Sequence, residues 1–128
     1  MHMKDEPVFD HEKLDYRLSI EFQAWVGELL DEGFGARPKP SATKHLDDAS
    51  TSISNNIAEG NGKRSKPDRA RFLDIACGSA FECAACIDAL VVRGLLDQGR
   101  AQRGKLLLHR IVSMLHKLRM MLCPQAQV

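Results

Sequence analysis

The sequence predicts an all-α protein, a single antiparallel up-and-down four-helix bundle. Three observations support this fold class. Apolar residues recur every three or four positions through most of the 128-residue chain, which is the period of an amphipathic helix. No segment shows the patterning of a strand. Short stretches rich in Gly, Pro or Ser divide the periodic segments into four, and four amphipathic helices joined by short loops form such a bundle.

The first two helices are expected at about residues 13–31 and 43–59. The first ends at the glycine- and proline-rich stretch EGFGARPKPS, which stops a helix and builds a loop. The second has a thinner apolar stripe, and Gly60 follows it where a left-handed C-terminal cap is expected. The stripe of the first helix consists of Leu14, Leu18, Phe22, Trp25, Val26 and Leu29.

The third and fourth helices are expected at about residues 66–93 and 97–122. Ser65, followed three residues later by Asp68, predicts a capping box that opens the third helix. Gly94 ends that helix and Pro124 ends the fourth. The whole chain, residues 1–128, therefore forms one domain with flexible ends at residues 1–10 and 124–128.

The composition limits the classes of protein to which the chain can belong. Hydrophobic residues make up 44% and charged residues 27%, as in soluble globular proteins. The net charge of +1 gives no overall attraction to nucleic acid or to an anionic membrane. No apolar run approaches the roughly 18 residues of a membrane span, and the charged start, MHMKDEPVFDHEK, is unlike a signal peptide. We expect a cytoplasmic protein with no membrane partner.

The four cysteines allow two interpretations. Cys83 and Cys86 form a CxxC pair on one helix face, a pattern found in redox and metal sites. Because the flanking segment SAFECAACIDALVV is an apolar helix interior, we expect buried, reduced thiols instead. No HxxxH or HExxH pair occurs in the sequence. We therefore expect no metal, no other cofactor and no enzymatic activity.

The stretch SISNNIAEGNGKRS, residues 52–65, has the composition of a ligand loop. It lacks the GxxxxGK[ST] spacing of a phosphate-binding loop and follows a helix rather than a strand. With the residues after it, it reads SISNNIAEGNGKRSKPDRARFLDIACGSAFE. This segment resembles the signature of the large-subunit rRNA intervening-sequence protein family, and the resemblance extends over about residues 13–122. The motif residues include Asn56, Glu59, Gly60, Gly62, Ser65, Gly78, Ser79 and Glu82.

The resemblance implies a four-helix bundle without established enzymatic activity. Some family members are encoded within insertions in rRNA genes, and related proteins are the accessory variability proteins of diversity-generating retroelements. Those relatives form pentamers that bind a reverse transcriptase and nucleic acid. The resemblance therefore implies a homopentamer, with RNA or an RNA-handling protein as partner. Asp47 and Asp48 replace the basic pair usual in the family, which weakens phosphate attraction at the second helix.

The polar motif residues allow a structural and a functional interpretation. Asn56 on the second helix, with Ser79 and Glu82 on the third, predicts either a buried polar site or a hydrogen-bond network that fixes the register of the two helices. We expect Glu82 to bond to the end of the second helix or to the turn at residues 60–65. Metal binding or catalysis by Glu59, Glu82 and the cysteines is an alternative function.

Basic residues gather at the second and third connections, which lie at opposite ends of an up-and-down bundle. The group at the second connection predicts either a solvated charged end or a phosphate contact. No aromatic residue is expected between these cations, so base stacking has little support. Direct nucleic-acid binding through residues 63–71 is the principal alternative function. The group consists of Lys63, Arg64, Lys66, Arg69 and Arg71.

Apolar residues on outward helix faces predict self-association. Phe81 and Val92 fall nearly opposite the core residues of the third helix, and similar residues occur on the first and fourth helices. Because they recur on three helices, we expect a non-enzymatic, homo-oligomeric scaffold that binds another macromolecule. The candidate interface residues are Tyr16, Ile20, Phe81, Val92, Val112 and Met120.

Overall fold

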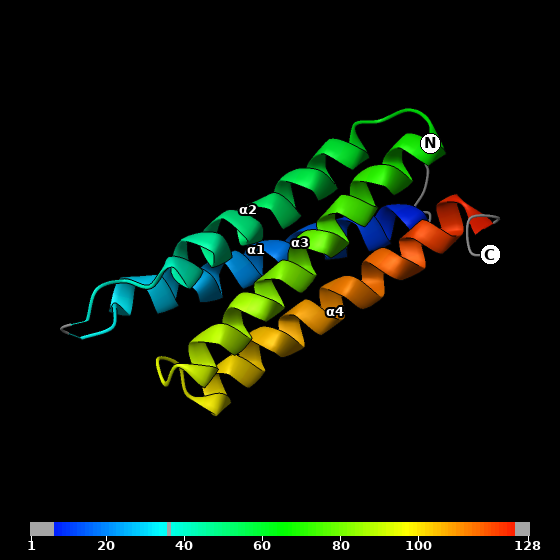
Figure 1. Ribbon diagram of the computed structural model, residues 1–128. Helices are drawn as coiled ribbons and strands as arrows, with labels where there is room; N and C mark the ends of the chain where they lie inside the picture. The colour runs from blue at the N-terminus through cyan, green and yellow to red at the C-terminus, as the bar shows by residue number, and fades with distance from the viewer. Residues whose placement is uncertain (1–6, 36, 125–128) are drawn as a thin grey trace.

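Four helices make up the part of the chain that the structure, a computed structural model, describes: residues 7–35 and 37–124 (Figure 1). They are α1, Pro7–Glu32; α2, Ser41–Asn61; α3, Lys66–Val92; and α4, Gln98–Leu122. Consecutive helices run in opposite directions. The predicted all-α four-helix bundle is confirmed.

The helices pack in a ring around one apolar core. α1 packs beside α2 and α4, and α3 packs beside the same two helices; within the described residues the backbones of the diagonal pairs stay apart. The contact between α2 and α3 is the most extensive. The largest fully buried side chains include Phe22, Ile53, Leu73 and Leu115, one from each helix.

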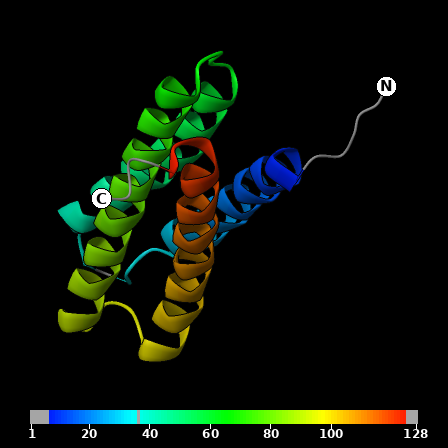
Figure 2. The same cartoon turned by 90° about the vertical axis from the view of Figure 1, so that its right-hand side faces the viewer.

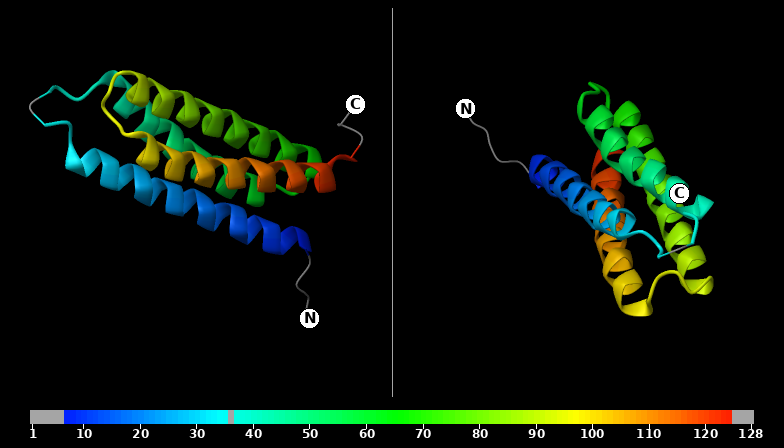
Figure 3. Two further views of the ribbon diagram at one scale, coloured as in Figure 1. Left: turned by 90° about the horizontal axis from the view of Figure 1, so that it is seen from below. Right: turned by 90° about the vertical axis from the view of Figure 1, so that its left-hand side faces the viewer.

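α1 crosses the other helices at an angle, and the N-terminal end of α1 diverges from α4 (Figures 2 and 3). Near the opposite end, Trp25 fills the space between α1 and α4 and stacks on Phe22, with ring centroids 5.7 Å apart. Gly104 of α4 is buried under the Trp25 ring, and a Cβ added there would lie 2.6 Å from the ring atom Cη2. The absence of a side chain at residue 104 therefore lets Trp25 enter the core.

α1 is longer than the apolar stripe predicts. It begins at Pro7 rather than near residue 13, so residues 7–10, expected to belong to a flexible end, are part of the helix. Proline is favoured in the first turn of a helix, which accounts for a start at Pro7. Residues 1–6 and 125–128, also expected to be flexible, lie outside the described residues.

The predicted ends of α3 and α4 have clear local causes. The Ser65 hydroxyl accepts a hydrogen bond from the Asp68 N–H at 3.2 Å, and the Asp97 carboxylate accepts one from the Arg100 N–H at 2.9 Å. Both are N-caps, which satisfy an otherwise free N–H group. Gly94 follows α3 with a φ of +73°, a conformation that glycine adopts readily.

Gly60 does not form the left-handed cap that the sequence predicts. α2 continues to Asn61, and its cap is Gly62 at a φ of −86°. Gly60 is instead buried against α3, where an added Cβ would lie 3.1 Å from the Cβ of Phe72. Its lack of a side chain serves the close approach of two helices, a tertiary requirement that the local sequence does not reveal.

α3 is long and apolar enough to cross a membrane, judged by length and composition alone. The expectation that no segment approaches a membrane span therefore needs correction. Isolated charged residues interrupt the apolar run of α3, but they are too few to make the helix polar. Core helices of soluble proteins meet the same criterion. However, only 28% of the most apolar window of α3 is buried, so much of its apolar surface faces outward.

Candidate functional site

The outward face of α3 carries a row of apolar and small residues, which we call the α3 ridge. Phe81 is 62% exposed and Val92 is 86% exposed, so the two residues predicted to face outward do so. Ile75, absent from the predicted interface, is also exposed. The ridge comprises Ile75, Gly78, Phe81, Ala85 and Val92, all on the exposed side of the helix.

The other predicted interface residues fall into two groups. Tyr16 and Ile20 on α1 and Met120 on α4 are exposed, as expected. Val112 is half-buried and packs against the core of its own chain, so it is not an open contact surface. Val112 follows the fully buried Ile111 and so lies at the edge of the core stripe of α4, a position that a helical wheel does not resolve. Leu106, missed by the sequence analysis, is exposed instead.

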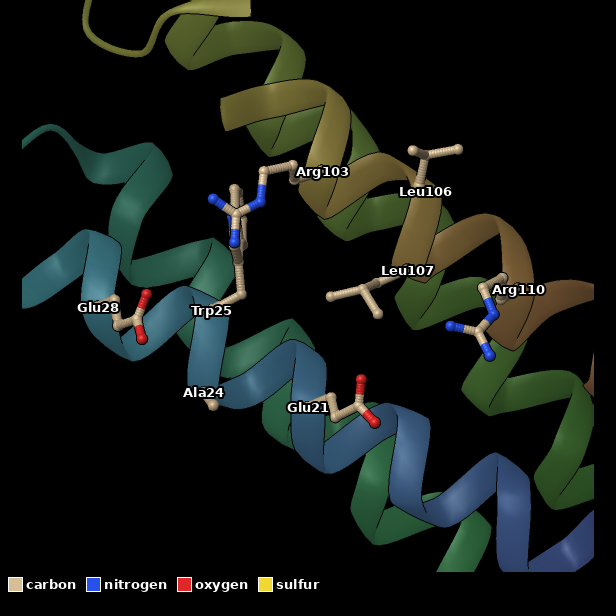
Figure 4. A pocket seen from close by; sticks show the side chains of 8 residues that line it. All are labelled: Glu21, Ala24, Trp25, Glu28, Arg103, Leu106, Leu107 and Arg110. Atoms are coloured by element: carbon tan, nitrogen blue, oxygen red, sulfur yellow. The ribbon is translucent and has the colours of Figure 1, made fainter. Parts of the chain in front are cut away.

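A groove of about 590 Å³ runs between α1 and α4 (Figure 4). Trp25 and Leu107 reach into the space between the two helices, whereas Leu106 lies at its edge and points outward. We call this feature the α1–α4 groove. It is lined by Glu21, Ala24, Trp25 and Glu28 of α1 and by Arg103, Leu106, Leu107 and Arg110 of α4.

The two rims of the α1–α4 groove have opposite charge. Glu21 and Glu28 stand on α1, and Arg103 and Arg110 stand on α4. None of these four side chains forms an ion pair within the described part of the chain. The groove therefore presents an apolar floor between two carboxylates on one rim and two guanidinium groups on the other, all four without an ion-pair partner among the described residues.

The basic residues of the second connection surround an aromatic ring, contrary to the sequence-based expectation. The Lys63 ammonium lies 5.1 Å and the Arg71 guanidinium 4.8 Å from the ring centroid of Phe72. Phe72 belongs to α3 and is half-buried, and the fold brings Lys63 back over it. Because its ring is already held by two cations, it is not a free platform for base stacking.

The same connection holds cations of two kinds. Lys63 pairs with Glu59 at 3.4 Å and Arg71 with Asp68 at 3.8 Å. Burial lowers the pKa of Arg69, which is half-buried. Arg64 and Lys66 are exposed, and neither has an ion-pair partner among residues 7–35 and 37–124. These two cations are the ones open to an anionic partner.

A polar network joins α2 to α3. The Asn56 side-chain amide donates hydrogen bonds to the carbonyl oxygen of Ser52 at 2.8 Å and to its hydroxyl at 3.1 Å. The Ser52 hydroxyl lies 2.7 Å from that of Ser79. Asn56 and Ser79 thus meet through Ser52. Their half-buried or buried positions require such partners.

Glu82 does not join this network. Its side chain is exposed, and it forms no hydrogen bond or ion pair with any described residue, so the predicted bond to the end of α2 or to the turn is wrong. The reason is helical geometry: Glu82 lies beside Phe81 on the outward side of α3, whereas Ser79 faces α2.

The alternative of a metal or catalytic site gains no support from the described residues. Glu59 is exposed and engaged by Lys63, and no group of three or more His, Cys, Asp or Glu side chains there is arranged to hold a metal ion. Burial raises the pKa of Cys83 to about 12 and also raises the pKa of Cys86. Thiols that resist ionisation are poor nucleophiles and poor metal ligands.

A buried carboxylate was missed by the sequence analysis. Asp15 on α1 is fully buried, and both of its carboxylate oxygens lack a hydrogen-bond partner within the described chain. Burial raises its pKa from an ordinary value of 3.8 to about 7. The helical pattern indicates this burial, because Asp15 lies seven residues before Phe22 and so on the same face of the helix.

Comparisons with known proteins place the chain in a family. A family model described as 23S rRNA-intervening sequence protein matches residues 13–117. The chain belongs to this family. Its fold is similar to the crystal structure of a protein of unknown function from the S23 ribosomal protein family of Bacteroides thetaiotaomicron. The TM-score is 0.80 at 19% identity, over 85% of this chain and 97% of that one. No curated protein shows significant similarity.

In this member of the intervening-sequence protein family, the motif segment forms the junction of α2 and α3. Gly60 permits close packing, Gly62 ends α2 and Ser65 caps α3. Gly78 is different: it is exposed, and an added Cβ would meet no described atom within 4 Å. Asp47 and Asp48 are exposed on α2, where Asp48 pairs with Lys44.

Proposed function

We propose that the protein is a non-enzymatic helical scaffold that self-associates through the α3 ridge. The observation that carries this proposal is the exposure of Phe81 and Val92 on the helix that packs most extensively in the bundle. Fully burying an apolar side chain of this kind contributes about 1.5–3 kcal/mol. α2 provides the contrast, because its outward side holds polar residues such as Lys44, Asp48 and Asn55.

A protein partner fits the α3 ridge better than a lipid bilayer does. Asp74, Glu82 and Asp88 are all exposed on α3. Asp74 pairs with Arg119, and Asp88 with Lys105, both on α4. Charges are costly in hydrocarbon, whereas the rim of a protein interface accommodates them. A cytoplasmic location without membrane contact is therefore part of the proposal.

The resemblance to pentameric relatives supports five as the subunit number. A ring of five uses the same contact between each pair of neighbours, so each chain contributes two different surfaces. A partner such as RNA or an RNA-handling protein would bind to the assembled ring rather than to a single bundle.

Light scattering coupled to size exclusion, at micromolar concentration, tests self-association. We expect a mass of several chains for the wild type and of one chain for Phe81→Glu. The matched control is Asn55→Glu, which adds the same charge to the exposed side of α2. Circular dichroism should show folded helices in all three proteins. A monomeric wild type would contradict the proposal.

Direct nucleic-acid binding is a second candidate function, favoured by Arg64 and Lys66. These exposed cations, without ion-pair partners in the described chain, stand beside the N-terminus of α3, where the helix dipole adds positive potential. Fluorescence anisotropy with a labelled RNA should then show binding that weakens as salt rises. Arg64→Glu/Lys66→Glu should abolish it. Absence of binding at low salt would eliminate this candidate.

A further inference from the structure

We infer that two different surfaces meet when copies associate: the α3 ridge of one copy docks into the α1–α4 groove of the next. This inference rests on the self-association proposed above and adds which surfaces form the contact. The occupant of the groove is thus a second copy of this chain.

The positions of the two surfaces favour a head-to-tail contact. The ridge lies on the outward side of α3, and the groove lies between α1 and α4. α1 and α3 are diagonal in the bundle, and their backbones stay apart within the described residues. A two-fold symmetric pair that joined ridge to ridge, or groove to groove, would leave the other surface of each copy uncovered. A head-to-tail contact covers both surfaces.

The ridge and the groove are complementary in shape. Phe81 projects between Gly78 and Ala85, one turn away on either side, and an added Cβ at Gly78 would meet nothing within 4 Å. An aromatic side chain flanked by small residues lets two helices approach closely around it. The groove supplies the matching space of about 590 Å³ above Trp25 and Leu107.

The charges are complementary as well. Beside the ridge, Glu82 and Arg93 are exposed and have no ion-pair partner among the described residues. The groove offers two arginines on its α4 rim and two glutamates on its α1 rim, none of them ion-paired within the described chain. Glu82 and Arg93 lie eleven residues apart on the same side of the ridge, so docking with α3 crossing the groove would bring Glu82 to the arginine rim and Arg93 to the glutamate rim. Contact between two ridges would leave all four groove charges without partners.

A mixing experiment with two variants tests this inference. Phe81→Glu spoils the ridge and leaves the groove intact; Arg103→Glu/Arg110→Glu makes both rims acidic and leaves the ridge intact. We expect each variant alone to be monomeric by light scattering. Mixed in equal amounts, they should form a one-to-one heterodimer, because one intact ridge and one intact groove remain.

The outcomes separate the two proposals. If the wild type is monomeric, self-association itself is wrong. If the wild type is oligomeric and the groove variant remains so, the groove is not the contact. A mixture that stays monomeric would also overturn the docking, because a single ridge and a single groove should suffice.

Two further variants test whether loss of assembly comes from the contact itself rather than from a change of charge elsewhere or from unfolding. Arg64→Glu/Lys66→Glu reverses two exposed cations at another part of the molecule and should leave the assembly intact. Val92→Glu provides a second ridge variant in case Phe81→Glu unfolds, since Val92 is even more exposed. Both variants should retain the circular dichroism spectrum of the wild type.

Discussion

Asp15 shows how a single residue sets the response of the bundle to pH. Its carboxylate is fully buried without a hydrogen bond in the described structure, so ionisation is costly in the folded state. Its folded pKa of about 7 lies above the ordinary 3.8 of the unfolded chain. As pH rises between these values the unfolded state loses its proton first, and stability falls. Above about pH 7 the loss is complete.

Replacing Asp15 by Asn should reveal this penalty. The pKa difference between about 7 and 3.8 corresponds to about 4 kcal/mol of unfolding free energy. Relative to the wild type, Asp15→Asn should therefore gain a few kcal/mol on going from about pH 4 to about pH 8. Urea denaturation of both proteins at the two pH values measures the gain. Parallel stability curves would show that Asp15 is not buried in charged form above pH 7.

Gly104 is the residue on which the packing of Trp25 depends. A Cβ at residue 104 would lie 2.6–2.8 Å from three atoms of the indole ring, and overpacking of this kind costs about 1–3 kcal/mol. Gly104→Ala should lower the melting temperature accordingly. Gly27→Ala on α1 is the control, because nothing lies within 4 Å of the added methyl group. That substitution should stabilise by about 0.5–1 kcal/mol, and equal effects of the two would refute the account.

At the scale of the elements, the last two helices each begin with a capping side chain, Ser65 for α3 and Asp97 for α4. Ser65 caps α3 after the short turn that follows Asn61. Ser65→Ala should cost about 1 kcal/mol in unfolding free energy. Ser113→Ala, an exposed position within α4, should change it by less than about 0.5 kcal/mol. Thermal denaturation compares the two; a loss at Ser113 as large as at Ser65 would argue against the cap.

The elements that could be predicted are those with local causes. The apolar stripes, the caps at Ser65 and Asp97 and the stop at Gly94 lie within a few residues of the features they determine. The start of α1 at Pro7 was not predicted, because the regular apolar stripe begins only at Leu14, and Val8 and Phe9 lie in a charged stretch. Gly60 was misassigned because Phe72, on another helix, decides its role.

The candidate site also has a part that the sequence predicts and a part that it does not. Helical periodicity alone places Phe81 and Val92 outward. The α1–α4 groove was not predicted, since it depends on the angle at which α1 meets α4 and on the fit of Trp25 over Gly104. Neither is encoded in the pattern of one helix. The position of the Phe72 ring between Lys63 and Arg71 likewise could not be predicted, because it depends on the path of the turn between α2 and α3.

At the scale of the whole molecule, the four helices differ in what they show to the outside. α2 presents polar residues, whereas α3 presents the ridge, and the α1–α4 groove presents free charges of both signs around an apolar floor. A bundle that stays single has no use for an exposed Phe81 beside a small-residue surface. A bundle that contacts its own copies at two different surfaces uses both features.

Ridge-to-groove contact also predicts a specific response to charge exchange. Arg103→Glu/Arg110→Glu should dissociate the assembly, and adding Glu82→Arg to the same chain should restore part of it, because opposite charges again face each other across the contact. Sedimentation velocity measures the recovered fraction. If Glu82→Arg gives no recovery in the reversed background, while Phe81→Glu still dissociates the wild type, Glu82 does not face the groove.

The most direct test of the central claim is the mass of the wild-type protein in solution. Light scattering at several micromolar concentrations should give a mass of several chains, and Phe81→Glu should reduce it to that of a single chain while the helices remain folded. A wild-type mass of one chain at every concentration would contradict the account.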